Sequence, residues 1–276
     1  MDKETWLLWL LADSQLPTGG FVASAGLEAA AQAGLVRDGA SDEDNSSFLS
    51  FICDSTRNQA RLTLPFCTRT HILTLDHLQR ISHEAGEEGE RSAIDAMLAD
   101  ISRVDSYHQS MLSSNRVAMR ASIAQGGGLL MLFNRGYAQA GFMADKRGQL
   151  CAGLAKRLQK RSRLGEIRAH WPTVFGFVCA ALNITQTHMQ QLFLFQFVRQ
   201  LFSAAVRLNL VGPLRAQTLQ CDMQPFVSDL LKQWGHAEVS MNSIEDVFGE
   251  SAVYTEPILE LYQGMHDRLY SRIFNS

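Results

Sequence analysis

The stretch TQTHMQQLFLFQFVRQLFSAAVRLNLVGP, residues 185–213, decides the fold class of this chain. Its large apolar residues recur every three or four positions, which places them on one face of an α-helix. They are Met189, Leu192, Phe193, Phe197 and Leu201. Thr185 is a residue type that caps helix N-termini, and Gly212 followed by Pro213 is a helix stop signal. The stretch therefore predicts one long helix between Thr185 and Gly212.

The same helical spacing recurs along the rest of the chain, around residues 48–55, 73–81, 94–101 and 261–269. Runs that alternate apolar and polar residues, which would indicate strands, are scarce. Usual helix and loop lengths then predict roughly ten helices. No repeat of fixed period and no change in composition divides the chain. We therefore expect a single all-α domain over residues 1–276.

Two local features interrupt the helical pattern. The acidic stretches 38–47 and 86–90 predict surface connections between helices. Three consecutive glycines, residues 126–128, predict that the helix there opens or bends sharply, because glycine is a poor helix former. Neither feature separates two domains.

The composition excludes several classes of protein. With 46% hydrophobic residues the chain is too apolar to be intrinsically disordered, and a net charge of -3 argues against a general nucleic-acid binder. The apolar runs 6–12 and 171–184 are too short to cross a bilayer. Five scattered cysteines without a CxxC pair indicate a reducing compartment. We expect a cytoplasmic protein with neither membrane nor nucleic-acid partners.

A search for catalytic motifs finds no convincing set. The chain has no phosphate-binding GxxxxGK[ST] loop and no HExxH zinc motif, so we expect no catalytic, metal or cofactor residue. The sequence Ala23-Ser24-Ala25-Gly26 is similar to part of a GxSxG nucleophile elbow, although Val22 replaces the first glycine. An all-α hydrolase that uses Ser24 is therefore kept as an alternative. We prefer Ser24 as the cap of a short helix over residues 25–33, ended by Gly34.

A basic segment, residues 156–168, stands out from the acidic background. Its cations are Lys156, Arg157, Lys160, Arg161, Arg163 and Arg168. We interpret it as a solvated helix and loop or as a docking patch for an acidic partner. The weaker alternative is an RNA-binding protein that contacts phosphates through this segment, which lacks aromatic residues for base stacking.

The segment HDRLYSRIFNS, residues 266–276, is unusual because chain ends are commonly polar. It combines aromatic and aliphatic residues with two arginines, and tyrosine and arginine are favoured at binding hot spots. We therefore predict a partner-docking segment. The alternative is that it packs back on its own domain.

Four separated blocks, spread over most of the chain, together resemble the urease accessory protein UreF family. The first is DSQLPTGGFVASAGLE (13–28) and the second is NRVAMRASIAQG (115–126). The third joins HWP at 170–172 and FG at 175–176 to the long helix and the break after it. The last is the segment 266–276, which is similar to the ending of eukaryotic-type members.

The resemblance implies an all-α protein that is not itself an enzyme. Members of the family form a homodimer and join a second accessory protein, UreD, also called UreH. The pair recruits the nickel-carrying GTPase UreG onto apo-urease, where GTP hydrolysis releases nickel. The resemblance therefore implies a chaperone for urease maturation that binds no cofactor itself, leaves nickel and GTP to its partners, and regulates the GTPase or forms part of a nickel conduit.

The resemblance also implies partner-binding residues. Partner docking is assigned to Phe21 and Glu28 in the first block and to His266, Tyr270, Arg272 and Phe274 in the last. Arg120, Ser122 and Gln125 are assigned to a surface that faces the GTPase or a second copy of the chain. Arg207 is assigned to partner binding or to a structural role. The basic segment 156–168 looks like an insertion relative to shorter bacterial members, so its role does not transfer.

Overall fold

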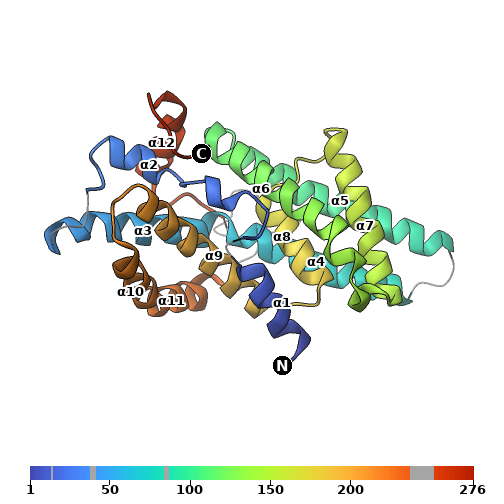
Figure 1. Ribbon diagram of the computed structural model, residues 1–276. Coiled ribbons are helices and arrows are strands. Elements are labelled where there is room, and N and C mark those ends of the chain that lie inside the picture. Colours follow the sequence, from blue (N-terminus) through green and yellow to red (C-terminus); the bar gives the residue numbers. More distant parts are fainter. Residues whose placement is uncertain (14, 38–41, 84–86, 237–251) are drawn as a thin grey trace.

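The computed structural model describes residues 1–276 except 14, 38–41, 84–86 and 237–251, and leaves the side chains of 42–46, 83 and 87 undescribed. Within the described ranges every regular element is a helix and no strand occurs (Figure 1). The α-helices are α1 (Lys3–Ala12), α2 (Leu27–Gln32), α3 (Asp42–Leu62), α4 (Leu64–His83), α5 (Glu87–Met111), α6 (Arg116–Arg135), α7 (Lys146–Arg163), α8 (Trp171–Ala181), α9 (Gln186–Arg207), α10 (Pro213–Asp222), α11 (Gln224–Trp234) and α12 (Pro257–Met265). The prediction of a single all-α domain of roughly ten helices is confirmed.

Helix α9 is the helix predicted from residues 185–213. The Oγ1 atom of Thr185 accepts a hydrogen bond from the backbone N–H of His188 at 3.4 Å, so the predicted cap is present. The helix ends at Arg207, and Pro213 begins α10. Helix α9 contacts α1, α2, α3, α4, α8, α10 and α11, so it connects most of the fold.

Helix α8 lies at the centre of the larger apolar cluster, and every residue from Pro172 to Ala181 is buried. It packs mainly against α4 and α6. A Cβ atom placed on Gly176 would lie 2.3 Å from the carbonyl oxygen of Cys67 in α4. Only glycine allows the two backbones to approach so closely.

Helix α6 runs without a break through Gly126, Gly127 and Gly128, so the predicted opening or bend is wrong. The reason is tertiary packing. A Cβ on Gly126 would lie 2.0 Å from the carbonyl oxygen of Ala169, and a Cβ on Gly128 would lie 3.1 Å from the Cα of Thr18. These two glycines allow other backbone segments to pack directly on α6, and this packing overrides their low helix propensity.

The two acidic stretches are also not simply connections. Residues 42–47 begin α3 and residues 87–90 begin α5, while 38–41 and 86 lie outside the described residues. Acidic residues suit the first turns of a helix, because the helix dipole places partial positive charge there. The prediction failed because an acidic run fits a helix start as well as a loop.

A second apolar cluster joins α2, α3, α10 and the C-terminal half of α9, and it includes Phe274. In Figure 1 these elements and α12 lie toward one end of the molecule, and α5 and α7 lie toward the other. All five cysteines are free, and Cys67, Cys151 and Cys179 are buried. No helix in the described part of the chain is long and apolar enough to cross a membrane.

Candidate partner-docking site

The loop before α2, residues 15–26, needs glycine for a left-handed backbone and for close packing against α12. Gly19 and Gly26 have φ angles of +79° and +88°, a left-handed backbone that favours glycine. A Cβ on Gly26 would lie 3.1 Å from the Cβ of Gln263, so this glycine also lets α2 pack closely against α12. The loop presents Phe21 on a single outward turn, Gly20–Val22, where its side chain is exposed.

Glu28, in the first turn of α2, is completely buried and anchors the segment 266–276. Its carboxylate accepts hydrogen bonds from the backbone N–H groups of Ile273 (2.6 Å) and Phe274 (3.1 Å). The same carboxylate lies 3.1 Å from Nε2 of His266, which is also buried. Three donors on one buried carboxylate satisfy it well. The segment therefore packs back on its own domain, and any docking role depends on what it leaves exposed.

Backbone hydrogen bonds join the same segment to the loop. The N–H of Asn275 donates to the carbonyl of Val22 at 2.9 Å, and the N–H of Ser24 donates to the carbonyl of Ser276 at 2.6 Å. The Ser24 hydroxyl is buried and donates to that same carbonyl at 3.1 Å. Ser24 is thus neither an exposed nucleophile nor the predicted cap, since Gly26 occupies the N-cap position of α2. The helix end at Gly34, with φ +77°, is as predicted.

Arg207, at the end of α9, connects the loop to the segment. Its guanidinium carbon lies 3.7 Å from the centre of the Phe21 ring and 4.3 Å from that of Phe274. Its Nε atom donates to the carbonyl of Ser203 at 3.2 Å, and partial burial lowers the pKa of its side chain. A cation between two aromatic rings holds both rings in place. Arg207 therefore has a structural role at this site.

Arg120, in α6, holds the start of the segment through a pair of hydrogen bonds to Asp267, at 3.1 and 2.8 Å. Arg272 lies 3.3 Å from the same carboxylate. The hydrogen bonds from Arg120 lower the pKa of Asp267 below its usual range. All three side chains are exposed, so the cluster forms part of the surface.

Ser122, also in α6, is tied to the segment that precedes α8. Its hydroxyl accepts a hydrogen bond from the N–H of Trp171 and lies within hydrogen-bond distance of Nδ1 of His170, both at 3.1 Å. Asp105 accepts three backbone N–H bonds from residues 168–170 at 2.8, 3.1 and 2.8 Å. Sequence reasoning missed Asp105, and it placed Asp267 in the docking segment without its pairing to Arg120. An acidic residue on the otherwise apolar face of a helix was the available signal for Asp105.

A cavity of about 230 Å³ lies between the loop, α3, α6, α9 and α12. Four of the residues predicted from the sequence line it, namely Phe21, Ser122, Gln125 and Arg207. Three buried polar atoms on its lining residues, Ser55 Oγ, Gln196 Oε1 and Arg207 Nη2, make no hydrogen bond within the described part of the chain.

The outer surface beside the segment is apolar. Helix α12 exposes Ile258, Leu261 and Met265, which are spaced three and four residues apart and so share one face. In the segment itself the Tyr270 side chain is completely exposed, and Ile273 is 62% exposed. Six large apolar side chains, these five and Phe21, thus face solvent on α12, on the segment 266–276 and on the loop that this segment contacts. We call this set the α12 surface.

The structure divides the predicted residues into three groups. Phe21, Tyr270, Arg120 and Arg272 are exposed, and Gln125, Ser122 and Arg207 are partly buried at the cavity. Glu28, His266 and Phe274 are buried beneath them and act on the surface only by holding it in place. Within the described ranges no three His, Cys, Asp or Glu side chains come together as a group that could hold a metal ion.

Comparisons with known proteins identify the family of this chain. The UreF family model matches residues 43–224. A urease accessory protein F from Arabidopsis thaliana is 30% identical, and the match covers 98% of this chain and 92% of that protein. A urease accessory protein F from Oryza sativa subsp. japonica is 28% identical over 98% of this chain and 84% of its own length. Urease accessory protein 6 from Cryptococcus neoformans var. grubii is 29% identical over 99% and 98%.

Proposed function

Because this chain belongs to the UreF family, whose members are urease accessory proteins, we propose that it assembles the complex that inserts nickel into apo-urease. Its role in urease maturation follows from the family. In the finer proposal it binds a UreD-type accessory protein and a UreG-type GTPase, acts as a homodimer in the cytoplasm, and leaves nickel and GTP to those partners. It is an accessory protein and not the catalyst.

The observation that carries the proposal is the α12 surface. Burying apolar area drives protein association, and large exposed apolar patches mark interaction sites. The surface is held from below by Glu28 and Arg207, so it is already ordered before a partner arrives. An ordered surface loses less conformational entropy on binding. We assign the UreD-type partner to this surface.

The proposal is tested by adding one charge at the centre of the surface. Leu261 is 68% exposed, so Leu261→Asp places a carboxylate at the interface without disturbing the core. We expect at least a tenfold loss of affinity for the purified UreD-type partner, because a buried charge without a partner is costly. Leu214 is 86% exposed on α10, away from this surface, so Leu214→Asp is the matched control.

Wild-type affinity in Leu261→Asp, or equal losses in both variants, would refute the assigned surface. The function itself is tested in cells that lack this chain. We expect urease there to be present, free of nickel and inactive, and we expect wild-type protein to restore both nickel and activity. Nickel-loaded urease in those cells would contradict the proposal.

For the GTPase or the second copy of this chain we propose the exposed part of α6 around Arg120, next to the α12 surface. The Arg120–Asp267–Arg272 cluster carries charge at the surface, and such charges set the rate and specificity of association. Separate binding measurements with Arg120→Glu distinguish the two occupants. The occupant is the GTPase if its association slows, and the second copy if the dimer dissociates. If neither changes, this surface is not used.

A further inference from the structure

Helix α12 differs from the other helices because none of its side chains is buried. In the described part of the chain every other α-helix buries at least one side chain. Only Leu259 and Tyr262 of α12 contact the smaller apolar cluster, and both stay partly exposed. Apolar burial supplies most of the stability of a helix in a protein, and a helix of nine residues is marginal on its own. Helix α12 is therefore held less firmly than the rest of the fold.

The chain on either side of α12 is anchored. On the N-terminal side Ala252 is buried in a small apolar cluster with side chains of α4 and α5. The backbone N–H of Thr255 donates a hydrogen bond to Oδ1 of Asn58 in α3, at 3.1 Å. On the C-terminal side His266 is completely buried beside the carboxylate of Glu28. Both ends thus hold the chain to other elements, whereas the helix between them buries nothing.

We call residues 252–266 the strap, because its ends are fixed and α12, between them, forms one wall of the cavity described above. Three side chains of its inner side line that cavity, and they are Leu259, Glu260 and Gln263. Two bonds between side chains hold this side to the corner between α5 and α6. Ser114 donates to Glu260 at 2.5 Å, and Asn115 donates to Gln263 at 3.1 Å. The first bond is exposed and the second is partly buried, so water competes for both.

The outer side of α12 faces solvent. Figure 1 shows the helix at the surface of the molecule, beside α2 and near one end of α6. This side carries Ile258, Leu261 and Met265 of the α12 surface, all of which are exposed. Nothing in the described ranges covers these side chains, so α12 can move outward without displacing the core.

We propose that the strap is a movable cover, in which α12 detaches from the α5–α6 corner while both ends stay attached, and that this opens the cavity to solvent. A local opening needs less free energy than global unfolding, because it exposes fewer buried groups. Nine residues without these contacts are too few to stay helical, so the open strap is an irregular link between two anchors. The closed form is the ground state, so the α12 surface is intact in it. The inference does not depend on which protein binds that surface.

Amide hydrogen exchange of the full chain tests the opening. The N–H groups of residues 261–265 are protected by the bonds of the helix, and Thr255 and Phe274 report on the two ends. We expect exchange at 261–265 to be about a hundredfold faster than in α8 and about tenfold faster than at both ends. Equal rates in α12 and α8 would mean that α12 opens only on global unfolding. Equal rates in α12 and at the ends would mean that the anchors do not hold. Either result refutes the inference.

Two variants shift the opening in opposite directions. The loose variant, Glu260→Ala/Gln263→Ala, removes both bonds to the α5–α6 corner and should accelerate exchange in α12 about tenfold. Alanine is the best helix former, so this acceleration would not come from lost helix propensity. The tight variant, Gly264→Ala, adds a Cβ in open space and should slow exchange in α12 about threefold.

Gly127→Ala is the matched control for the tight variant, because it makes the same change in open space on α6. It should leave exchange in α12 at the wild-type rate. If the loose variant exchanges like wild type, or if Gly127→Ala slows α12 as much as Gly264→Ala does, these contacts do not control the opening and the inference is refuted.

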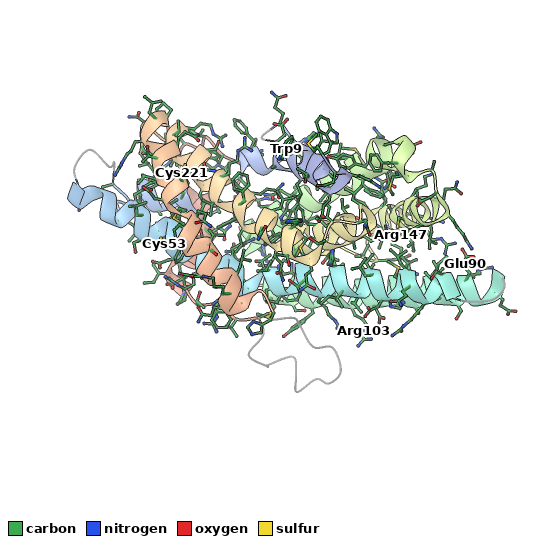
Figure 2. The ribbon with its side chains drawn as sticks, turned by 90° about the horizontal axis from the view of Figure 1, so that it is seen from below. Trp9, Cys53, Glu90, Arg103, Arg147 and Cys221 are labelled. Carbon is green, nitrogen blue, oxygen red and sulfur yellow. The ribbon has the colours of Figure 1, made fainter. Side chains whose placement is uncertain are left out.

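A thiol placed in the cavity measures whether the strap covers it. Ser55 lines the cavity, and its buried hydroxyl makes no hydrogen bond with any described residue, so Ser55→Cys should be tolerated. Figure 2 shows Cys53 and Cys221 toward the same end of the molecule, and they are the two thiols that are not buried. The background Cys53→Ser/Cys221→Ser removes them. The same background without Ser55→Cys is the control, since its remaining thiols are buried.

The probe is dithiodipyridine, a small neutral disulfide that reacts with exposed thiols. We expect its reaction with the thiol at position 55 to be about tenfold faster in the loose variant and about threefold slower in the tight variant, in parallel with exchange in α12. The control should not react on this timescale. If the thiol reacts at one rate in all variants while exchange in α12 changes, α12 opens without exposing the cavity, and the proposed cover is refuted.

Discussion

The α4–α8 contact and the attachment of residues 266–276 to α2 are held together in different ways. The first is an apolar interface spread over many buried side chains, closed by one glycine at Gly176. The second depends on a few polar contacts that converge on Glu28. Apolar packing is distributed, whereas a polar anchor is lost with a single side chain. The first contact therefore decides whether the chain folds, and the second decides whether the α12 surface is correctly placed.

The largest effect is expected where the helix backbones touch. In Gly176→Ala the new Cβ would lie 2.3 Å from the carbonyl oxygen of Cys67 and 3.1 Å from the Cβ of Thr70, so α4 must move away from α8. We expect a loss of about 3 kcal/mol in the free energy of unfolding, the upper range for overpacked cores. Denaturant unfolding followed by circular dichroism measures it.

Gly127→Ala is the matched control for this prediction. It is the same substitution inside a helix, but no atom lies within 4 Å of the new Cβ. We expect a gain of roughly 0.5–1 kcal/mol, since alanine is the better helix former. Similar stability in the two variants would show that the close α4–α8 approach is not the source of the effect.

The second largest effect concerns the polar anchor. Glu28→Ala leaves the N–H groups of Ile273 and Phe274 and the ring of His266 without their acceptor. Each unsatisfied buried group costs about 1–3 kcal/mol, so we expect the segment to detach locally while the core stays folded. Amide hydrogen exchange should accelerate by at least tenfold at Ile273 and Phe274, with little change in α8.

Gln32→Ala provides the comparison within the same helix. Its side chain donates one exposed hydrogen bond to the carbonyl of Ser271, at 3.0 Å. Loss of an exposed bond costs little, so exchange at Ile273 should stay close to wild type. Uniform acceleration across α8 in Glu28→Ala would mean that the Glu28 anchor and the α4–α8 core unfold together. The two contacts would then not be independent.

The difference between contacts among chain neighbours and contacts among distant residues explains what the sequence could predict. Helical spacing, the Thr185 cap and the Gly212–Pro213 stop depend on neighbours in the chain, and these predictions of α9 were right. The glycines of α6 were misread because their effect depends on Ala169 and Thr18, which are distant in the chain. Local patterns reveal elements, but not which backbone will lie against a glycine.

For the candidate site the sequence singled out segments that the fold brings together, but not their geometry. Phe21 and Tyr270 are exposed as a docking role requires, and the segment 266–276 was singled out by its composition. That Glu28 and His266 are buried partners could not be inferred, because 238 residues separate them. Their pairing is a property of the folded chain, and periodicity carries no information about it.

A third prediction extends the comparison to pH. Three histidines are buried inside the fold. Burial lowers the pKa of His71, of His170 and especially of His108 below the ordinary value of 6.5. Because the folded pKa values lie below 6.5, the unfolded chain binds more protons than the folded chain as the pH falls below that value. Stability is therefore complete above that pH and is lost as the pH falls, by up to about 1 kcal/mol for each ring between pH 7 and pH 5.5.

The contribution of one ring can be isolated with His108→Phe, which keeps an aromatic side chain against Phe66 and His170. Urea unfolding of this variant at several pH values should give a shallower decline than wild type below pH 6.5. An unchanged slope would assign the acid sensitivity to other groups.

The smallest effect is expected at the exposed cluster of Arg120, Asp267 and Arg272. Arg120→Gln removes two hydrogen bonds to Asp267, but all three side chains are exposed, so the loss should stay within about 0.2–1 kcal/mol. A sharper readout is the pKa of Asp267, which Arg120 lowers below 3.8 and which should rise toward 3.8 in the variant, as followed by NMR. Because a lowered acid pKa stabilises only above the unfolded value, this contribution is complete above pH 3.8 and is lost as the pH falls through the folded value. An unchanged Asp267 titration would mean that Arg272 alone holds the carboxylate, and the start of the segment would then be anchored from within, independently of α6.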